Sequence, residues 1–352
     1  MPRVHQLLSG AGPHDAITTE AVHFRALFTR WGWGGGDWAA RIVPGISAIQ
    51  PIGRFHADPT DLLLLHHSAA MPRLSQLLAL PNPMLLLYHN ITPAGWLWDH
   101  APVVAAHCEI GRAQLEPILQ RCDRAAADSA FNAQELKAFG GGEVDVIPLP
   151  VDPAHLGPPG PEPTEPPTVL FVGRLSPHKR QEEVIAAFAA YRRERAPEAR
   201  LILVGDPLTA DYATLLRGLG ERLAPGAVTV ESGIDQASLA QHYRSAHALL
   251  CLSAHEGFCI PLLEAFHFGV PIVARPAGAV PEVLGDAGLL VPDTDPAVVA
   301  ELLHLVVIDR PLRDELRHRG HHRLRRFAPA QTAEALRRAI EATFSERREI
   351  SV

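Results

Sequence analysis

The chain has 352 residues, of which 47% are hydrophobic, and it carries a formal net charge of −7. This length favours two domains, because single hydrophobic cores seldom grow past roughly 250 to 300 residues. The hydrophobic content excludes a disordered chain, and the mild acidity argues against a nucleic-acid binder.

The termini and the cysteines indicate the compartment. The N-terminus lacks the apolar stretch of a signal peptide, and the longest apolar run is far shorter than the ~18 residues that span a bilayer. No C-x-x-C pair occurs among the four cysteines, which argues against a zinc site and for four buried, small apolar residues in a reducing compartment: Cys108, Cys122, Cys251 and Cys259. We expect a soluble cytoplasmic protein, with peripheral contact at the inner membrane face kept as an alternative.

The first half of the chain alternates strand-like and helical segments. Apolar runs predict strands at 3–9, 61–68, 83–90, 125–130 and 144–150, and 16–32 is a candidate helix. Seven prolines between 153 and 168 then predict an extended, semi-rigid linker near the middle of the chain.

The second half alternates more regularly. Short apolar runs typical of buried strands occur at 168–173, 200–206, 228–233, 248–253, 271–275 and 288–291, and helical patterns lie between them at 181–194, 211–223, 236–246 and 296–307. This alternation predicts a parallel sheet with helices on both faces. We therefore expect an α/β chain with two doubly wound, Rossmann-like domains that face a cleft.

The C-terminal segment predicts an amphipathic helix at 328–348. Ala333, Leu336, Ile340 and Phe344 fall at spacings of three and four, which gives a single apolar stripe. The predicted division is therefore an N-terminal domain at 1–152, the linker at 153–168, a second domain at 169–327 and a C-terminal helix at 328–352. That helix either docks on the second domain or crosses back to the first.

The stretch HEGFCIPLLEAF (255–266) combines two carboxylates with residues typical of a core. The preceding strand ends at Ser253, and Pro261 suits the first turn of a helix. Glu256 therefore falls in a strand-to-helix loop, and Glu264 is expected in the first turn of the helix. A helix N-terminus with free N–H groups is a ready anion site.

A basic cluster follows the strand at 168–173. Gly173 turns the chain, and Arg174 and Lys179 come just before the next helix. Helix N-termini favour anions over cations, so two cations at this place suit a bound diphosphate better than a purely structural turn. A solvated basic turn is the alternative.

The segments GRLSPHKR (173–180) and HEGFCIPLLEAFHFGVPI (255–272) together resemble the C-terminal domain of retaining glycosyltransferases of family four. The resemblance covers residues 168–292. It implies the GT-B fold, a nucleotide-diphosphate sugar as donor and no cofactor or metal. More loosely, LLLYHNITP (85–93) and ADSAFNAQELKAFG (127–140) resemble N-terminal domains of bacterial enzymes that build surface polysaccharides. The loop at 9–21 departs from that pattern, because it lacks paired glycines beside the helix.

The resemblance also implies roles for individual residues. Arg174 and Lys179 would bind the donor diphosphate and stabilise the departing nucleotide. Glu264 would bind the ribose hydroxyls and Glu256 the transferred sugar.

The remaining implied roles belong to loops. Backbone N–H groups in the loop after Glu256 would contact sugar and phosphate: Gly257, Phe258, Cys259 and Ile260. His89 would face the donor sugar from the first domain, and Ile234 would contact the base.

Other activities fit less well. A glycosidase would set two carboxylates about 5–5.5 Å apart across the bond and has no need of a diphosphate clamp. A sugar-nucleotide epimerase of the same fold, or a non-catalytic binding partner, stays open. Asp293 and Asp295 form a D-x-D, but Asp295 precedes Pro296 and an apolar helix, which predicts a helix cap and no metal site.

The roles of two sequence features and the identity of the substrates have more than one interpretation. His66 and His67 end a strand, and each is either a ligand contact or a structural histidine. The arginine-rich run at 313–327 is either a solvated helix face or an attraction for anionic lipid. The resemblance suggests mannose from GDP-mannose, moved to a saccharide or lipid-linked saccharide in polysaccharide synthesis.

Overall fold

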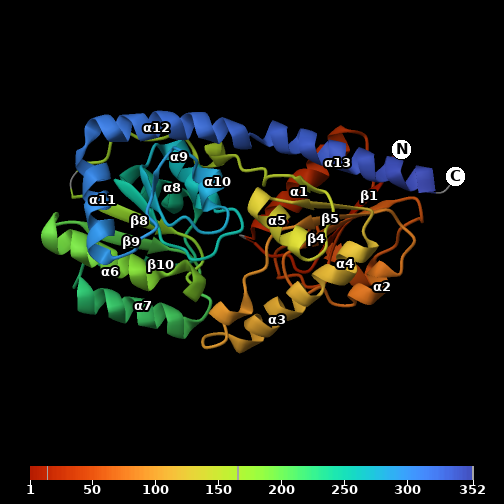
Figure 1. Cartoon of the computed structure of the whole chain (residues 1–352), viewed down its shortest axis with the longest axis horizontal. Coiled ribbons are helices and arrows are strands. Elements are labelled where there is room, and N and C mark those ends of the chain that lie inside the picture. The colour runs from red at the N-terminus through yellow and green to blue at the C-terminus, as the bar shows by residue number, and fades with distance from the viewer. Residues whose placement is uncertain (14, 165, 351–352) are drawn as a thin grey trace. The chain divides into compact units, whose positions relative to one another are not determined.

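The computed structural model describes residues 1–13, 15–164 and 166–350, with side chains described through Glu346. The chain folds into two compact units (Figure 1). Unit 1 comprises Met1–Ala94, Val103–Pro150 and Phe327–Val352, and unit 2 comprises Gly95–Pro102 and Val151–Arg326.

Unit 1 is built on a seven-stranded parallel sheet with the order β3-β2-β1-β4-β5-β6-β7. Its strands are β1 (Val4–Leu8), β2 (Asp37–Ala39), β3 (Gln50–Pro51), β4 (Leu62–His67), β5 (Met84–Tyr88), β6 (Arg124–Ala127) and β7 (Val144–Val146). The strand order reverses between β1 and β4, which are paired from Val4↔Leu62 to Leu8↔His66. In open α/β sheets, ligands bind at the carboxyl ends of strands beside such a reversal.

Alternate residues of the central strands pack on opposite faces of this sheet. Leu63, Leu65 and Leu86 pack with residues of α4 (Leu115–Arg121) and α5 (Ala130–Ala138), while Leu62 and Leu64 face α1 (Ala16–Arg30) and α13 (Pro329–Ile350). Two further helices of this part of the chain are α2 (Leu74–Leu78) and α3 (Pro102–Ala113). Period-two alternation thus fills two cores from one sheet.

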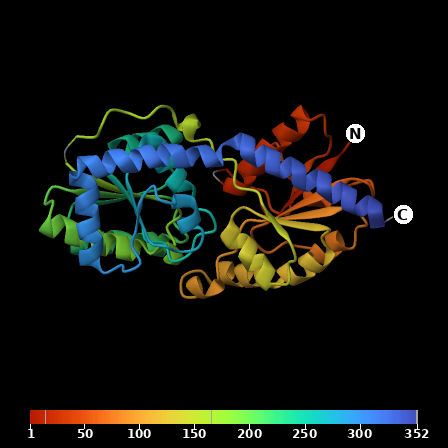
Figure 2. The same cartoon turned by 45° about the horizontal axis from the view of Figure 1, so that its top comes forward.

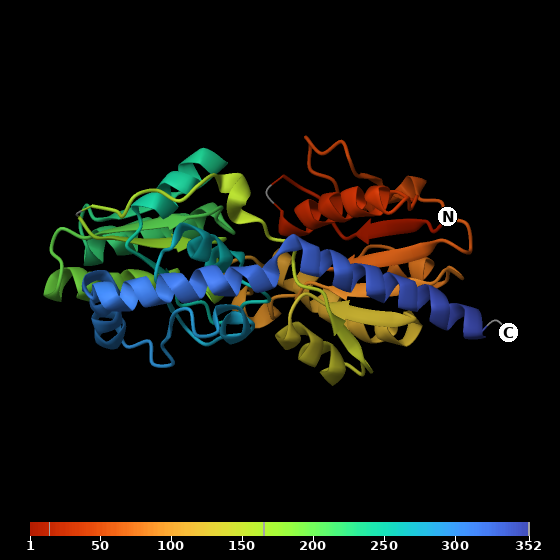
Figure 3. The ribbon, with the colours of Figure 1, turned by 90° about the horizontal axis from the view of Figure 1, so that it is seen from above.

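The C-terminal helix α13 belongs to unit 1. Leu336 and Ile340 are fully buried against Phe24 and Phe28 of α1, and Figures 2 and 3 show α13 lying over this unit's helix and strands. The predicted apolar stripe is present, because Ala333 and Phe344 also pack against this core.

Unit 2 holds a six-stranded parallel sheet with the order β10-β9-β8-β11-β12-β13. Its strands are β8 (Thr168–Val172), β9 (Arg200–Val204), β10 (Val228–Glu231), β11 (Ala248–Cys251), β12 (Ile272–Ala274) and β13 (Leu289–Leu290). Here the order reverses between β8 and β11. Each of the six runs predicted from the second half of the sequence contains one of these strands.

Helices cover both faces of the unit 2 sheet, with α6 and α7 on one side and α8 and α9 on the other (Figure 1). The helices are α6 (Gln181–Glu194), α7 (Ala210–Leu223), α8 (Gln236–Ser245), α9 (Ile260–Phe268), α10 (Val280–Leu284), α11 (Pro296–Ile308) and α12 (Arg310–Leu324). The main core joins α6 and α11 to the strands, and Val184, Phe188, Leu303 and Val306 are all fully buried.

Local signals explain several boundaries. Asp295 caps α11 by accepting a hydrogen bond from the Ala297 N–H, and Pro296 is the first residue of the helix, so the capping prediction for this D-x-D is confirmed. Ser129 caps α5 in the same way, accepting from the Asn132 N–H. The strand predicted at 125–130 therefore ends at Ala127, because its last residue already begins this helix.

The proline-rich segment is not extended throughout. It opens with a short 3₁₀ helix, η3 (Pro153–Leu156), whose Asp152 cap accepts from the Ala154 N–H. The arginine-rich run falls mainly in α12, followed by η5 (Arg325–Phe327). No helix within the described residues is both long enough and apolar enough to serve as a membrane span.

Candidate functional site

The predicted donor residues gather at the strand reversal of unit 2. Gly173 and Arg174 follow β8 directly, and Lys179 ends the short 3₁₀ helix η4 (Pro177–Lys179). Glu256 lies in the loop between β11 and α9. Because β8 and β11 are neighbouring parallel strands, their carboxyl ends lie side by side, which brings the two sequence motifs to one place.

Lys179 and Glu256 form a tight ion pair across these two loops. The Lys179 Nζ donates to both carboxylate oxygens of Glu256 at 2.7 Å, and the side chains are 18% and 7% exposed. Burial alone would lower the pKa of Lys179, but the charge of Glu256 and the hydrogen bond to it raise that pKa above its ordinary value. The lysine is therefore held as a cation.

A third loop, which connects β12 to α10, contacts the backbone of Glu256. The Ala279 N–H donates to the Glu256 carbonyl at 2.9 Å. Gly278 has a φ of +58°, and a Cβ at this position would lie 2.1 Å from the same carbonyl oxygen. Only glycine therefore permits this approach of the β12–α10 connection. The sequence reasoning did not select Gly278, although its place in PAGAV, just after a strand, was a signal for it.

Glu264 lies one turn later than predicted. Helix α9 begins at Ile260, so Glu264 is its fifth residue and belongs to the second turn, which corrects the first-turn prediction. Its Oε2 accepts a hydrogen bond from the Tyr243 hydroxyl at 2.6 Å, and burial raises the pKa of the carboxyl group. Tyr243, from α8, is a site residue that sequence reasoning missed.

Cys259 caps α9 in a left-handed backbone conformation, with a φ of 77°. Its Sγ lies 3.9 Å from that of Cys251, and both side chains are buried. The burial predicted for all four cysteines holds for Cys251 and Cys259, whereas Cys108 and Cys122 are only half-buried. The neighbouring Phe258 is also buried, so this loop is anchored by its own side chains.

Arg174 and Ile234 are two further residues predicted to contact the donor. Arg174 is exposed at the carboxyl edge of the sheet, and its guanidinium forms no hydrogen bond or ion pair with the described residues. Ile234 lies in the connection between β10 and α8, at the far end of the strand order from β13. Their contacts with a donor stay predictions.

The histidines of unit 1 lie at the carboxyl edge of its own strand reversal. The His67 Nε2 lies 2.8 Å from the Gly111 carbonyl oxygen, and burial lowers the pKa of His67 to about 4, which suits a structural role. His66 and His89 stack with ring centroids 5.2 Å apart, and both side chains are 0% exposed. The donor-facing role predicted for His89 stays a prediction, because its ring is enclosed within unit 1.

Carboxylates surround this histidine pair. Burial raises the pKa of Glu20 to about 7 and lowers the pKa of His66. For His89, burial is outweighed by the charges of Glu20 and Asp128, which raise its pKa. Sequence reasoning missed Glu20 and Asp128, because nothing in their spacing relates them to the histidines.

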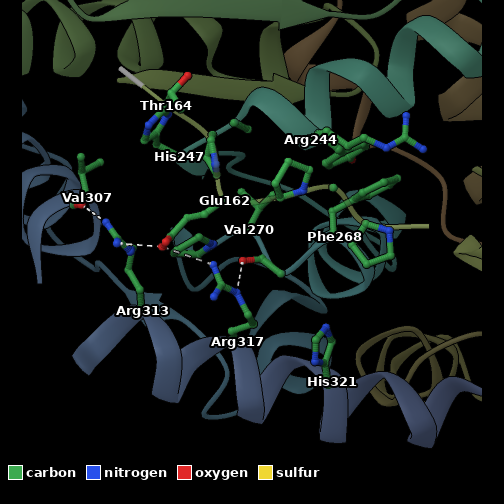
Figure 4. A pocket seen from close by; sticks show the side chains of 18 residues that line it. Glu162, Thr164, Arg244, His247, Phe268, Val270, Val307, Arg313, Arg317 and His321 are labelled. Atoms are coloured by element: carbon green, nitrogen blue, oxygen red, sulfur yellow. Dashed lines mark hydrogen bonds and ion pairs between the residues drawn. The ribbon is translucent and has the colours of Figure 1, made fainter. Parts of the chain in front are cut away.

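A cavity of about 740 Å³ opens at the opposite edge of the unit 2 sheet (Figure 4). It is lined by residues that precede β11 and β12, among them His247 and Val270, so it lies away from the donor residues. Glu162 of the proline-rich segment pairs there with Arg313 and lies 3.9 Å from Arg317. Part of the arginine-rich run is thus committed to internal contacts.

The arrangement in unit 2 suits a ligand with two negative charges and several hydroxyls. Lys179, a half-buried cation, pairs with Glu256 in the loop that leads to the N-terminus of α9, where N–H dipoles favour anions, and the exposed Arg174 follows the neighbouring strand β8. Two carboxylates lie on either side of that terminus and are able to accept hydroxyl hydrogen bonds.

Comparison with known proteins agrees with this geometry. Residues 158–323 match the model of the family described as glycosyl transferases group 1. A D-inositol 3-phosphate glycosyltransferase of Kineococcus radiotolerans is 30% identical over 331 residues, covering 84% of this chain and 71% of the relative. The O-antigen chain mannosyltransferase B of Escherichia coli is 30% identical over 138 residues, covering 38% of this chain and 35% of the relative.

The fold also matches solved structures. HepE of Anabaena, in complex with UDP and glucose, superposes with a TM-score of 0.69 at 17% identity, covering 97% of this chain and all of that one. This likeness shows the GT-B fold predicted from the sequence. The family model that matches residues 158–323 and the relative that is 30% identical over 84% of this chain establish that the chain belongs to the glycosyl transferases group 1 family.

Proposed function

We propose that this protein is a retaining glycosyltransferase that moves a hexose from a nucleotide-diphosphate sugar to a hydroxyl of a saccharide acceptor. The observation that carries the proposal is the meeting of Arg174, Lys179 and Glu256 at the strand reversal of unit 2, beside the N-terminus of α9. The names of the relatives, which include glycosyl- and mannosyltransferases, support the same reaction class.

The reaction needs charge stabilisation more than a nucleophile. When the bond from the anomeric carbon to the phosphate oxygen breaks, positive charge develops on the sugar and negative charge on the leaving diphosphate. Arg174, Lys179 and the N–H groups from Gly257 to Ile260 would stabilise that negative charge. A phosphate oxygen would take the acceptor proton as the acceptor oxygen attacks from the same face, which retains the configuration.

Each glutamate would hold a different part of the donor. Glu256 would accept hydrogen bonds from the transferred sugar while Lys179 keeps it ionised. Glu264 would bind the ribose hydroxyls with the lone pairs that Tyr243 leaves unused. Ile234 would contact the base, and His89 would act on the sugar only in a conformation that uncovers its ring.

The identities of the donor and the acceptor rest on the names of the relatives. The mannosyltransferase named among the relatives supports mannose, and therefore GDP-mannose, and its O-antigen chain supports an acceptor in surface polysaccharide synthesis. HepE was solved with UDP and glucose, so UDP-glucose is the second donor to test. The two cations make a divalent metal unnecessary for donor binding, so transfer should proceed without added Mg²⁺ or Mn²⁺.

A binding panel tests the donor half first. Thermal unfolding is measured with UDP, GDP, ADP and their sugars, because a ligand at 100 times its Kd adds about 2.7 kcal/mol of stability. One nucleotide should raise the melting temperature of the wild type, and Glu264→Ala should reduce that rise. Failure of every nucleotide to shift unfolding would overturn the assignment.

Turnover tests the chemistry. Nucleotide release in the presence of a mannose-terminated acceptor should be abolished by Arg174→Ala, while Arg217→Ala, an exposed arginine of α7, serves as the matched control. Epimerised donor in the absence of acceptor would instead indicate a sugar-nucleotide epimerase. Unchanged turnover in Arg174→Ala would exclude the proposed clamp.

A further inference from the structure

A second group of chemically capable side chains lies in unit 1, apart from the donor residues. Glu20 comes from helix α1, His66 ends strand β4 and His89 follows strand β5. All three side chains are 0–1% exposed. They meet at the carboxyl edge beside the strand reversal of unit 1, which is where an open α/β sheet binds its ligands.

The three inward-facing atoms have the spacing of metal ligands. The His66 Nδ1 and the His89 Nε2 are 3.0 Å apart, and the Glu20 Oε2 lies 3.6 and 3.4 Å from them. The point equidistant from these three atoms lies about 1.9 Å from each of them. An ion slightly above or below the plane of the three atoms would lie at the roughly 2.0–2.2 Å of zinc–nitrogen and zinc–oxygen bonds.

The surrounding hydrogen bonds orient His66 for ligation. The amide nitrogen of Gln6 donates to the Ala21 carbonyl and to Asp37, both at 2.7 Å, so its Oε1 faces the His66 Nε2 at 3.0 Å. The Nε2 must then carry the proton, because Oε1 is only an acceptor. The His66 Nδ1 is left with its lone pair pointing toward Glu20 and His89.

A carboxylate lies near the other ring nitrogen of His89, at ion-pair distance. The Asp128 Oδ2 lies 3.5 Å from the His89 Nδ1, and Asn132 donates a hydrogen bond to the other oxygen of Asp128. With a proton on Nδ1, the His89 Nε2 could offer a lone pair to an ion that replaces the proton shared with His66. Carboxylate and amide partners behind ligating histidines are the usual outer contacts of zinc sites.

At most one proton lies between the two facing nitrogens of this arrangement. The His66 Nδ1 and the His89 Nε2 share a hydrogen bond at 3.0 Å, and among the residues that the structure describes neither oxygen of Glu20 accepts a hydrogen bond. An enclosed carboxylate without such partners is costly. A cation at the equidistant point would accept all three lone pairs, whereas a shared proton serves only two nitrogens.

We infer that Glu20, His66 and His89 form a binding site for a divalent transition-metal ion, with Zn²⁺ as its best fit. Two imidazole nitrogens and one carboxylate oxygen favour zinc over Mg²⁺ or Ca²⁺, which prefer oxygen ligands. The ion ties helix α1 to strands β4 and β5. The ion is separate from the donor diphosphate, but it would occupy both nitrogens of the His89 ring together with Asp128, so this inference takes the place of the sugar contact proposed for His89.

The test uses the full chain without a histidine tag. After exposure to Zn²⁺ and removal of the free ion, elemental analysis should give about one zinc per wild-type chain. Glu20→Gln keeps the shape of the buried side chain and should lower zinc affinity about tenfold or more, measured by competition with a chromogenic chelator. His67→Gln is the matched control, because His67 is equally buried in the same strand but bonds Gly111.

Cobalt substitution separates this site from the thiols of unit 2. Co²⁺ bound by Glu20, His66 and His89 should give visible absorption without a thiolate charge-transfer band in the near ultraviolet. A thiolate band would assign the ion to Cys251 and Cys259 and overturn the inference. Zinc affinity in Glu20→Gln equal to that of the wild type, or no retained zinc, would do the same, and neither result depends on transferase activity.

Discussion

The Lys179–Glu256 ion pair is the residue-scale feature on which the donor half depends. Both charges are largely removed from water, and such pairs are strongly coupled because each ion loses its hydration. Without a donor, the pair keeps the two loops at the ends of β8 and β11 together. A diphosphate would share Lys179 with Glu256 rather than find an unengaged cation.

The first prediction concerns the removal of one partner. Lys179→Met should lower the free energy of unfolding by about 3 kcal/mol, because it leaves the Glu256 charge enclosed and unpaired. Urea unfolding checks this value. Lys179→Met combined with Glu256→Gln should recover most of the loss, and a double variant no more stable than Lys179→Met would show that the pair is not the cause.

The second prediction concerns acid stability at His178. Burial, together with nearby positive charges, lowers the pKa of His178 to about 2. Below the unfolded pKa of roughly 6.5, the unfolded chain binds a proton that the folded chain does not. The stability from this group is therefore present above that pH and falls as the pH decreases, by up to about 1.4 kcal/mol per pH unit.

Unfolding between pH 7.5 and 5 tests this behaviour. His178→Gln should reduce the slope of stability against pH, whereas His318→Gln, an exposed histidine of α12, should leave the slope as in the wild type. Equal slopes in all three proteins would contradict the buried neutral state of His178.

The sequence identifies a site residue where a local pattern, such as its place just after a strand, determines its position. Arg174, Lys179 and Glu256 follow strands, so parallel pairing brings them to one edge. Tyr243 and Glu20 were missed because their partners, Glu264 and His89, are distant in sequence and are selected only by packing. Glu264 was misplaced by one turn, because Pro261 marks a helix start only approximately.

At the scale of elements, apolar runs predicted the central strands because those strands are buried on both faces. β2 and β3 were missed, since they are only three and two residues long and the latter is exposed. The first-half helices α3 and α4 were also missed. Their buried residues, such as Leu115 and Ile118, are too few to give a clear stripe.

The third prediction concerns helix α13. Leu336→Ala should destabilise unit 1 by about 2–5 kcal/mol, because it opens a cavity against Phe24 and Phe28 in a core with no solvent access. Thermal unfolding followed by circular dichroism measures the effect. Glu334→Ala, on the exposed side of the same helix, is the control, and an equally small effect of both would show that α13 is not docked in solution.

At the scale of the whole molecule, the division of the chain is less regular than the sequence suggested. The segment Gly95–Pro102 belongs to unit 2, where Trp96 lies under Arg180 and His100 contacts Tyr212. The C-terminal helix belongs to unit 1. An amphipathic stripe requires a surface to cover, but it does not say which surface, so neither assignment could come from periodicity.

The fourth prediction follows from the separate cores of the two units. The hydrophobic cluster around Phe24 contains residues of unit 1 alone, and the cluster around Phe188 contains residues of unit 2 alone. Calorimetry should therefore resolve two unfolding transitions. Leu336→Ala identifies the transition of unit 1 by lowering it. A nucleotide at 100 times its Kd should raise only the other transition, by about 5–10 °C, since about 2.7 kcal/mol is added to a unit of this size. A single transition, or a nucleotide shift confined to the transition that Leu336→Ala lowers, would contradict donor binding by unit 2 alone.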